Sequence, residues 1–164
     1  MKFPSGSKAG SKYRTAVSIV RKLREAGHEA YLVGGSVRDL LMKRPPKDFD
    51  IATDARPEQV GRLFRKTIPL GVQFGVQMVI QAGAPFEVAT FRTDREYRDS
   101  RHPEAVIFSS PKEDALRRDF TVNGLFYDPL KRRIIDFVGG REDLKRRRIR
   151  AIGDPRKRFA EDRL

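Results

Sequence analysis

Residues 32–51 read LVGGSVRDLLMKRPPKDFDI, and this stretch decides the fold. It continues a short apolar run, 31–33, that predicts a buried strand ending at a pair of glycines. The spacing then predicts a helix over 36–42, a loop at the two prolines, and a second strand over 48–51. A strand, a glycine turn, a helix and another strand in close succession are typical of an α/β (α+β) domain.

The second strand carries two carboxylates, Asp48 and Asp50, two residues apart. Alternate residues of a strand point to the same face, so the two like charges are expected side by side. Hard oxygen ligands of this kind suit Mg²⁺, which relieves their repulsion. The pair also fits an exposed strand edge with two solvated aspartates.

The glycine turn precedes the aspartates by about a dozen residues. Gly34 and Gly35 let backbone N–H groups approach a phosphate closely at the start of a helix, and Ser36 adds a hydroxyl donor. An ordinary tight turn has the same sequence. The nearby acidic pair favours a phosphate site.

A third acidic residue, Glu87, lies within the otherwise apolar or small residues of FEVATFR, residues 86–92. A carboxylate in such a strand is costly to bury unless it is paired or binds a metal. Glu87 is therefore either a third carboxylate of a metal site or the partner of an arginine such as Arg92.

Two adjacent arginines, Arg117 and Arg118, stand near the end of a predicted helix. Their planar guanidinium groups suit the oxygens of a triphosphate. Asp119 and Asn123 lie four residues apart, so they would share a helix face and could receive a ribose. A solvated charge run is the alternative.

The rest of the chain alternates helices and strands without internal repeats. Residues 1–12 predict a flexible basic tail. The further predicted elements are helices over 13–26, from residue 57, over 110–118, 120–125 and 141–146 and from residue 155, and strands over 72–80, 86–92, 134–138 and 148–152. Four or five strands interrupted by helices predict a small mixed sheet.

Composition narrows the function. The chain of 164 residues has no Cys and two His, which excludes disulfides, zinc fingers, iron–sulfur sites and thiol nucleophiles. Its apolar runs are too short to cross a membrane, so a cytoplasmic protein is expected. A net charge of +13 favours a polyanionic partner such as RNA, DNA or nucleotide phosphates.

In order and spacing, these motifs together resemble the class II tRNA nucleotidyltransferases and bacterial poly(A) polymerases, which belong to the DNA polymerase β-like nucleotidyltransferases. The resemblance covers about residues 14–164. It implies a catalytic head over 13–140 and the start of a helical neck over 141–164. It also implies metal-dependent transfer of a nucleotidyl group from CTP or ATP to an RNA 3′ end, that of tRNA.

The resemblance also assigns residue roles. Two Mg²⁺ ions would be held by Asp48 and Asp50, with Glu87 as the nearby third carboxylate. Nucleotide would be bound by Gly34, Gly35, Ser36, Arg38 and Arg118 at the triphosphate and by Asp119 and Asn123 at the ribose.

The last motif of the family reads Glu-Asp-x-x-Arg and selects the base. Glu161 and Asp162 match its start, and the arginine would directly follow Leu164, which predicts a fragment or a reduced relative. A poly(A) polymerase head and a nucleotide- or RNA-binding module without turnover are the alternatives. The segment 71–76 lacks the arginine-rich pattern of poly(A) polymerases, and the loop 97–103 is similar to that of tRNA enzymes, which favours CCA or A addition.

Overall fold

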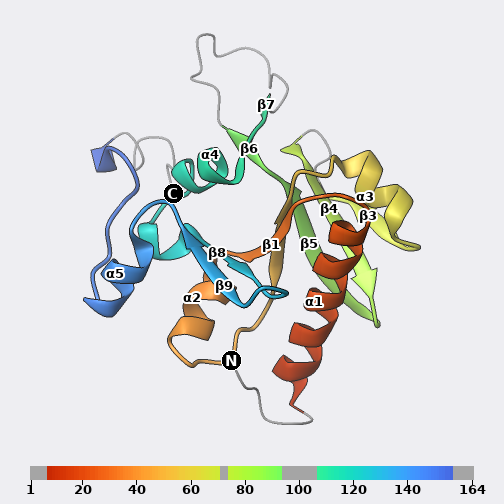
Figure 1. Ribbon diagram of the computed structural model, residues 1–164, viewed down its shortest axis with the longest axis horizontal. Coiled ribbons are helices and arrows are strands. Elements are labelled where there is room, and N and C mark those ends of the chain that lie inside the picture. The colour runs from red at the N-terminus through yellow and green to blue at the C-terminus, as the bar shows by residue number, and fades with distance from the viewer. Residues whose placement is uncertain (1–6, 71–73, 94–106, 157–164) are drawn as a thin grey trace.

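A computed structural model describes residues 7–70, 74–93 and 107–156. A seven-stranded mixed sheet has the order β3-β4-β5-β2-β1-β8-β9, and a separate two-stranded ribbon joins β6 and β7 (Figure 1). The strands are β1 (Ala30–Val33), β2 (Asp50–Thr53), β3 (Thr67–Pro69), β4 (Val76–Gln81), β5 (Ala84–Thr90), β6 (Arg92–Thr93), β7 (Ile107–Phe108), β8 (Leu125–Asp128) and β9 (Arg133–Asp136). The helices are α1 (Lys8–Glu25), α2 (Gly35–Leu41), α3 (Pro57–Leu63), α4 (Pro111–Leu116), the 3-10 helix η2 (Thr121–Asn123) and α5 (Gly140–Lys145).

The N-terminal helix is longer than its apolar pattern predicts. The hydroxyl of Ser7 accepts a hydrogen bond from the Gly10 N–H and caps α1, which therefore begins at Lys8. The prediction of a flexible tail over 1–12 is thus wrong for residues 8–12, and residues 1–6 lie outside the described part of the chain. The cap adds more than one turn to the predicted helix.

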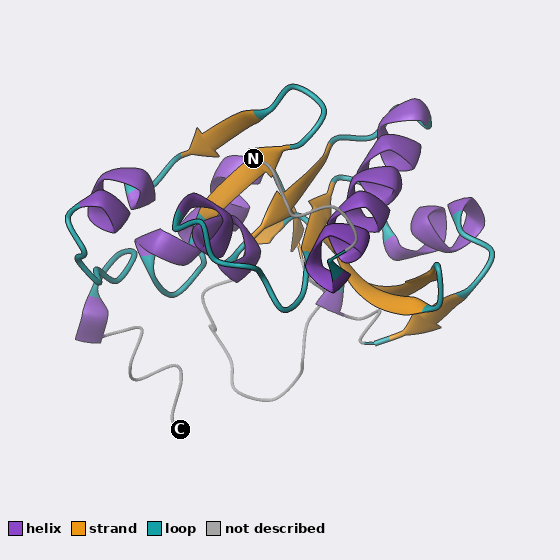
Figure 2. Cartoon of the chain, turned by 90° about the horizontal axis from the view of Figure 1, so that it is seen from below, coloured by secondary structure: helices purple, strands orange, loops and turns teal. Residues whose placement is uncertain are grey.

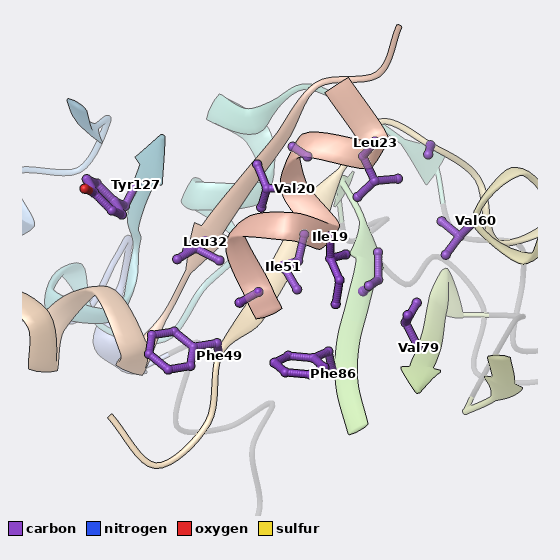
Figure 3. Packing of buried hydrophobic residues seen from close by; sticks show 14 of the residues in the cluster. Ile19, Val20, Leu23, Leu32, Phe49, Ile51, Val60, Val79, Phe86 and Tyr127 are labelled. Atoms are coloured by element: carbon purple, nitrogen blue, oxygen red, sulfur yellow. The ribbon is translucent and has the colours of Figure 1, made fainter. Parts of the chain in front are cut away.

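The larger core lies between α1, α3 and one face of the sheet. Figure 3 shows Val20 and Ile19 of α1 near Leu32 and Ile51 of the central strands, with Leu23 further along the helix on the side of Val60. All six side chains are fully buried. Figure 1 shows α1 lying along the sheet beside α3, so these two helices close this face.

Strand alternation sends the neighbouring side chains to the opposite face. A second, smaller cluster there contains Val33, Ala52, Phe126 and Ala115 of α4. Viewed from below, the strands run through the middle of the molecule with helices on both sides (Figure 2). The smaller cluster covers only part of its face, which leaves room for polar side chains on the same strands.

Residues 120–125 do not form the predicted helix. They form η2 and then enter β8, which pairs with β1 and β9 in the sheet. All four residues of β8 are buried, and the first three form a short apolar run of the kind that a strand covered on both faces shares with a helix segment. Hydrophobic periodicity alone does not distinguish a doubly buried strand from a short helix.

Other elements of the structure also differ from the elements predicted from the sequence. Of the predicted strand 148–152, only Ala151 forms a bridge, with Phe120. Strand β3 and the β6–β7 ribbon were not predicted, because two or three residues are too few to show a period. No helix in the described ranges is long and apolar enough to cross a membrane.

Candidate active site

The glycine turn links β1 to α2 at the centre of the sheet. Gly34 has φ 68° and ψ −143°, which only glycine adopts without strain. Its N–H donates a hydrogen bond to the Leu125 carbonyl (3.3 Å), which ties the turn to β8. The Ser36 hydroxyl is buried and donates to the Val33 carbonyl (2.9 Å), so it stabilises the turn.

The two aspartates sit at the start of β2. The strand begins at Asp50, so the prediction of a strand from residue 48 was two residues early. Phe49 between them is buried in the larger core, while Asp48 and Asp50 are both exposed, as the same-face argument requires. Lys12 of α1 donates a 2.9 Å hydrogen bond to Asp48 Oδ1, so a cation already contacts this carboxylate.

Glu87 is brought beside Asp50 by sheet topology. Strand β5 pairs with β2 in parallel, and the register Ile51↔Val88 makes Asp50 and Glu87 neighbours across the two strands. Ile51 and Val88 point into the larger core, so Asp50 and Glu87 point to the opposite face. The two carboxylates therefore share a face.

The electrostatics of Asp50 reflect these neighbours. Desolvation by the surrounding protein and repulsion from Glu87 raise the pKa of Asp50 above its ordinary value, while attraction to Arg118 opposes the rise and Asp48 adds to it. Among the described residues, no group of three His, Cys, Asp or Glu side chains is arranged as a metal site. The three acids thus influence one another without forming a ready-made cage.

The guanidinium of Arg118 faces these acids and the glycine turn. A methyl group placed on Gly34 would lie 3.5 Å from Arg118 Nη1 and 3.9 Å from Asp50 Oδ2. Asp114, which is 1% exposed, accepts hydrogen bonds from Arg118 Nη2 (2.9 Å) and Arg117 Nε (2.9 Å). Asp114 is therefore a positioning residue that holds Arg118, and its spacing from the two arginines was the signal that sequence reasoning missed.

A second network lies along α2 and η2. Arg38 Nη1 donates to Asn123 Oδ1 (2.7 Å), and Asn123 Nδ2 donates to both carboxylate oxygens of Asp119 (3.3 Å). Arg38 Nε also donates to Asp39 (3.0 Å), and a methyl group on Gly35 would lie 3.4 Å from Arg38 Nη2. Asp119 and Asn123 do come together, although Asp119 lies in a bend before η2 and only Asn123 belongs to that 3-10 helix.

Two further predicted features lie outside the described residues. These are Glu161 and Asp162 of the base-selecting motif, and the loop 97–103. The other predicted site residues fall into two groups. One contains Gly34, Asp50, Glu87 and Arg118, with Asp48 at its edge and the buried Ser36 hydroxyl bonded inside the turn. The other contains Arg38, Asp119 and Asn123, with Gly35 beside the Arg38 guanidinium.

The fold, which groups acids, an arginine and a glycine turn on one sheet, defines the class of head domain to which the chain belongs, and comparison with known proteins agrees. Residues 30–150 match the model of the poly A polymerase head domain family, and the chain belongs to this family.

The curated relatives are longer proteins with one shared name. The chain is 49% identical over 150 residues to the CCA-adding enzyme of Bacillus pumilus, covering 91% of this chain and 37% of that protein. It is 48% identical over 153 residues to the CCA-adding enzyme of Geobacillus stearothermophilus, covering 93% and 38%. The chain therefore spans less than two fifths of the relatives' length.

Solved structures show the same relationship. The Bacillus stearothermophilus CCA-adding enzyme in complex with CTP matches with a TM-score of 0.82 and 45% identity, covering 92% of this chain and 36% of that one. The Thermotoga maritima CCA-adding enzyme complexed with tRNA matches with a TM-score of 0.68 and 28% identity, covering 91% and 34%. The family resemblance and the predicted fold class are thus confirmed.

Proposed function

We propose that this chain is the catalytic head of an enzyme that adds nucleotides from CTP or ATP to the 3′ end of tRNA. The observation that carries the proposal is the convergence of Arg118 and Asp50 on the Gly34 turn. One group suits a phosphate and the other a metal ion, and both lie where the backbone can be approached closely. The names of the relatives supply the CCA reaction and the tRNA substrate.

The donor set fits a divalent cation. Asp48 and Asp50 offer hard oxygens on an open face, and Lys12 already places a positive charge on Asp48. Desolvation, and after it repulsion from Glu87, raises the pKa of Asp50, and a bound cation would favour the charged carboxylate. Mg²⁺ held by Asp48 and Asp50, with Glu87 nearby, would activate the RNA 3′-hydroxyl and steady the triphosphate, and we propose two ions.

The remaining residues orient the nucleotide. Arg118, fixed by Asp114, would bind phosphate oxygens, and Arg38 would hold Asn123 and Asp119 in place for the ribose. The 3′-hydroxyl oxygen forms a bond to the α-phosphorus, the bond to the β-phosphate oxygen breaks, and pyrophosphate leaves with that electron pair. The hydroxyl proton passes to solvent or a nearby base.

The test uses tRNA that lacks its terminal CCA, labelled CTP or ATP, and Mg²⁺. The intact chain, or the chain extended to the length of its relatives, should add label, and Asp50→Asn should abolish the addition. Asp54→Asn is the matched control, because Asp54 lies just beyond β2 and binds His28 instead of facing the site. Equal activity in the Asp50→Asn and control variants would refute the assignment.

Product length separates the alternatives. Addition that stops at a completed CCA end supports the proposal, whereas a long run of A identifies a poly(A) polymerase head. Mg²⁺-dependent CTP binding by the intact chain, without addition by either form, identifies a binding module. A cytoplasmic location stays a prediction from the sequence.

A further inference from the structure

A second surface, away from the acidic face, has the chemistry of a binding site. A groove of about 720 Å³ runs between the middle of α1 and the turn that joins β8 to β9. Its lining includes Val17, Leu130 and Pro129 and three arginines, but no acidic residue. An apolar floor with a basic rim favours an extended anionic ligand.

The arginines are placed in a line. Arg14 and Arg21 stand seven residues apart on one face of α1, two turns or about 10 Å along the axis. Arg132 faces them from the β8–β9 turn. All three are exposed, and none has an ion-pair partner in the part of the chain that the structure describes. Their charge is available to a ligand.

Arg132 is held in an unfavourable backbone conformation. Its φ of 53° lies in the left-handed region, where a non-glycine residue is strained. The turn is fixed by Asp128, whose carboxylate accepts the N–H groups of Leu130 and Lys131 (both 3.0 Å) and pairs with Arg24 (3.1 Å). A glycine would fit this φ without strain, so Arg132→Gly would remove the side chain without straining the turn.

The groove lies on the side of the sheet that holds the larger core, opposite to the face of Asp50 and Glu87. Tyr13 lines the groove, and its ring centroid lies 5.7 Å from that of Phe49, the residue between Asp48 and Asp50. Burial and a hydrogen bond with Tyr127 raise the pKa of Tyr13, so the floor adds no negative charge at neutral pH. The groove therefore offers a contact surface that is separate from the acidic face.

We propose that this groove binds the sugar–phosphate backbone of RNA, with phosphates on Arg14, Arg21 and Arg132. The identity of the ligand rests on the proposed function, which supplies an RNA substrate. Proteins bind single-stranded nucleic acids in positively charged grooves that follow the backbone, and the three arginines supply that charge here. An acidic peptide is the alternative ligand.

The experiment measures binding of fluorescein-labelled tRNA lacking its CCA end by anisotropy across a range of KCl concentrations. In Arg14→Gln/Arg21→Gln, loss of two phosphate contacts should lower the slope of log K against log salt by about 1.4 to 1.8 and weaken binding at 0.1 M salt roughly tenfold. The matched control is Arg62→Gln/Arg65→Gln, which removes the same charge from exposed residues at α3. The control should bind nearly as the unchanged chain does.

The Arg132→Gly variant tests whether a loss of RNA binding comes from the lost charge or from unfolding. It should lower the slope by about 0.7 to 0.9 while keeping the thermal midpoint, because glycine accepts this φ without strain. Three results would overturn the proposal. The salt slope could be unchanged in the groove variants, or the control could lose as much tRNA affinity as they do. The groove variants could also lose affinity for poly-glutamate but not for tRNA.

Nucleotide binding keeps the two proposals apart. Mg²⁺-dependent CTP binding, measured by calorimetry, should be equal in the unchanged chain and the groove variants. If nucleotide addition fails while the groove-dependent loss of tRNA binding remains, the proposed function is refuted and the groove is supported.

Discussion

Asp114 offers the sharpest test of how the site is held together. Its carboxylate is 1% exposed and receives both arginines, Arg117 and Arg118, whose side chains are 18% and 17% exposed. Asp114→Asn keeps the shape of the side chain and removes its charge. Breaking a buried pair by removing one partner costs about 3–5 kcal/mol, and the partial exposure of the arginines favours the lower end, about 3 kcal/mol.

The matched control is Glu142→Gln on α5. It breaks the Arg146–Glu142 pair, which has the same four-residue spacing but side chains that are 58% and 53% exposed, and exposed pairs contribute only about 0–1 kcal/mol. Urea unfolding followed by far-UV circular dichroism measures both variants. A loss of about 3 kcal/mol corresponds to a fall in the melting midpoint of about 6–12 °C.

The same variant should weaken CTP binding in Mg²⁺, because Arg118 loses the group that orients it. A loss of stability no larger than that of Glu142→Gln would refute the account of Asp114 as a buried anchor. Unchanged CTP binding in a folded Asp114→Asn protein would refute the positioning of Arg118 by this residue.

Three further predictions concern single residues. Because the native pKa of Asp50 is raised, ionisation of this carboxyl destabilises the fold. Without metal, the Asp50→Asn variant should have the same stability as the unchanged chain below about pH 3.8 and a higher stability as the pH rises to 7. Denaturant titration at a series of pH values measures this trend. Added Mg²⁺ should stabilise only the unchanged chain, and the reverse pH trend would contradict this assignment. Gly34→Ala should cost about 1–3 kcal/mol by thermal unfolding and weaken CTP binding, since φ 68° strains alanine; unchanged stability would count against this geometry. Gly140→Ala should destabilise the fold strongly, because the methyl group would lie 2.0 Å from the Thr121 carbonyl oxygen. Gly61→Ala within α3 should leave the stability unchanged or raise it by up to about 1 kcal/mol. Similar stability of the two variants would refute the close contact at Gly140.

The local features were readable from the sequence for physical reasons. The polar–apolar alternation indicated that Asp48 and Asp50 are exposed on either side of a buried Phe49, although Asp48 lies just before the strand. Ser110, with Pro111 and Glu113, marked the start of α4 through its capping box. Gly34 was recognisable as a turn residue because its backbone conformation excludes side chains. Errors arose where that local logic is ambiguous, as at the doubly buried strand β8 and the cap that lengthens α1.

The long-range contacts of the site required the tertiary structure. Glu87 neighbours Asp50 only because β5 joins β2 in parallel, and no local pattern states which distant strands pair or in what register. Arg38 reaches Asn123, 85 residues away, and Asp114 turns Arg118 toward the glycine turn because packing fixes their side-chain directions. The sequence by itself determined which chemical groups the protein has and on which local elements they stand. Folding decided which of them meet, because strand pairing and side-chain direction depend on contacts between residues far apart in the chain.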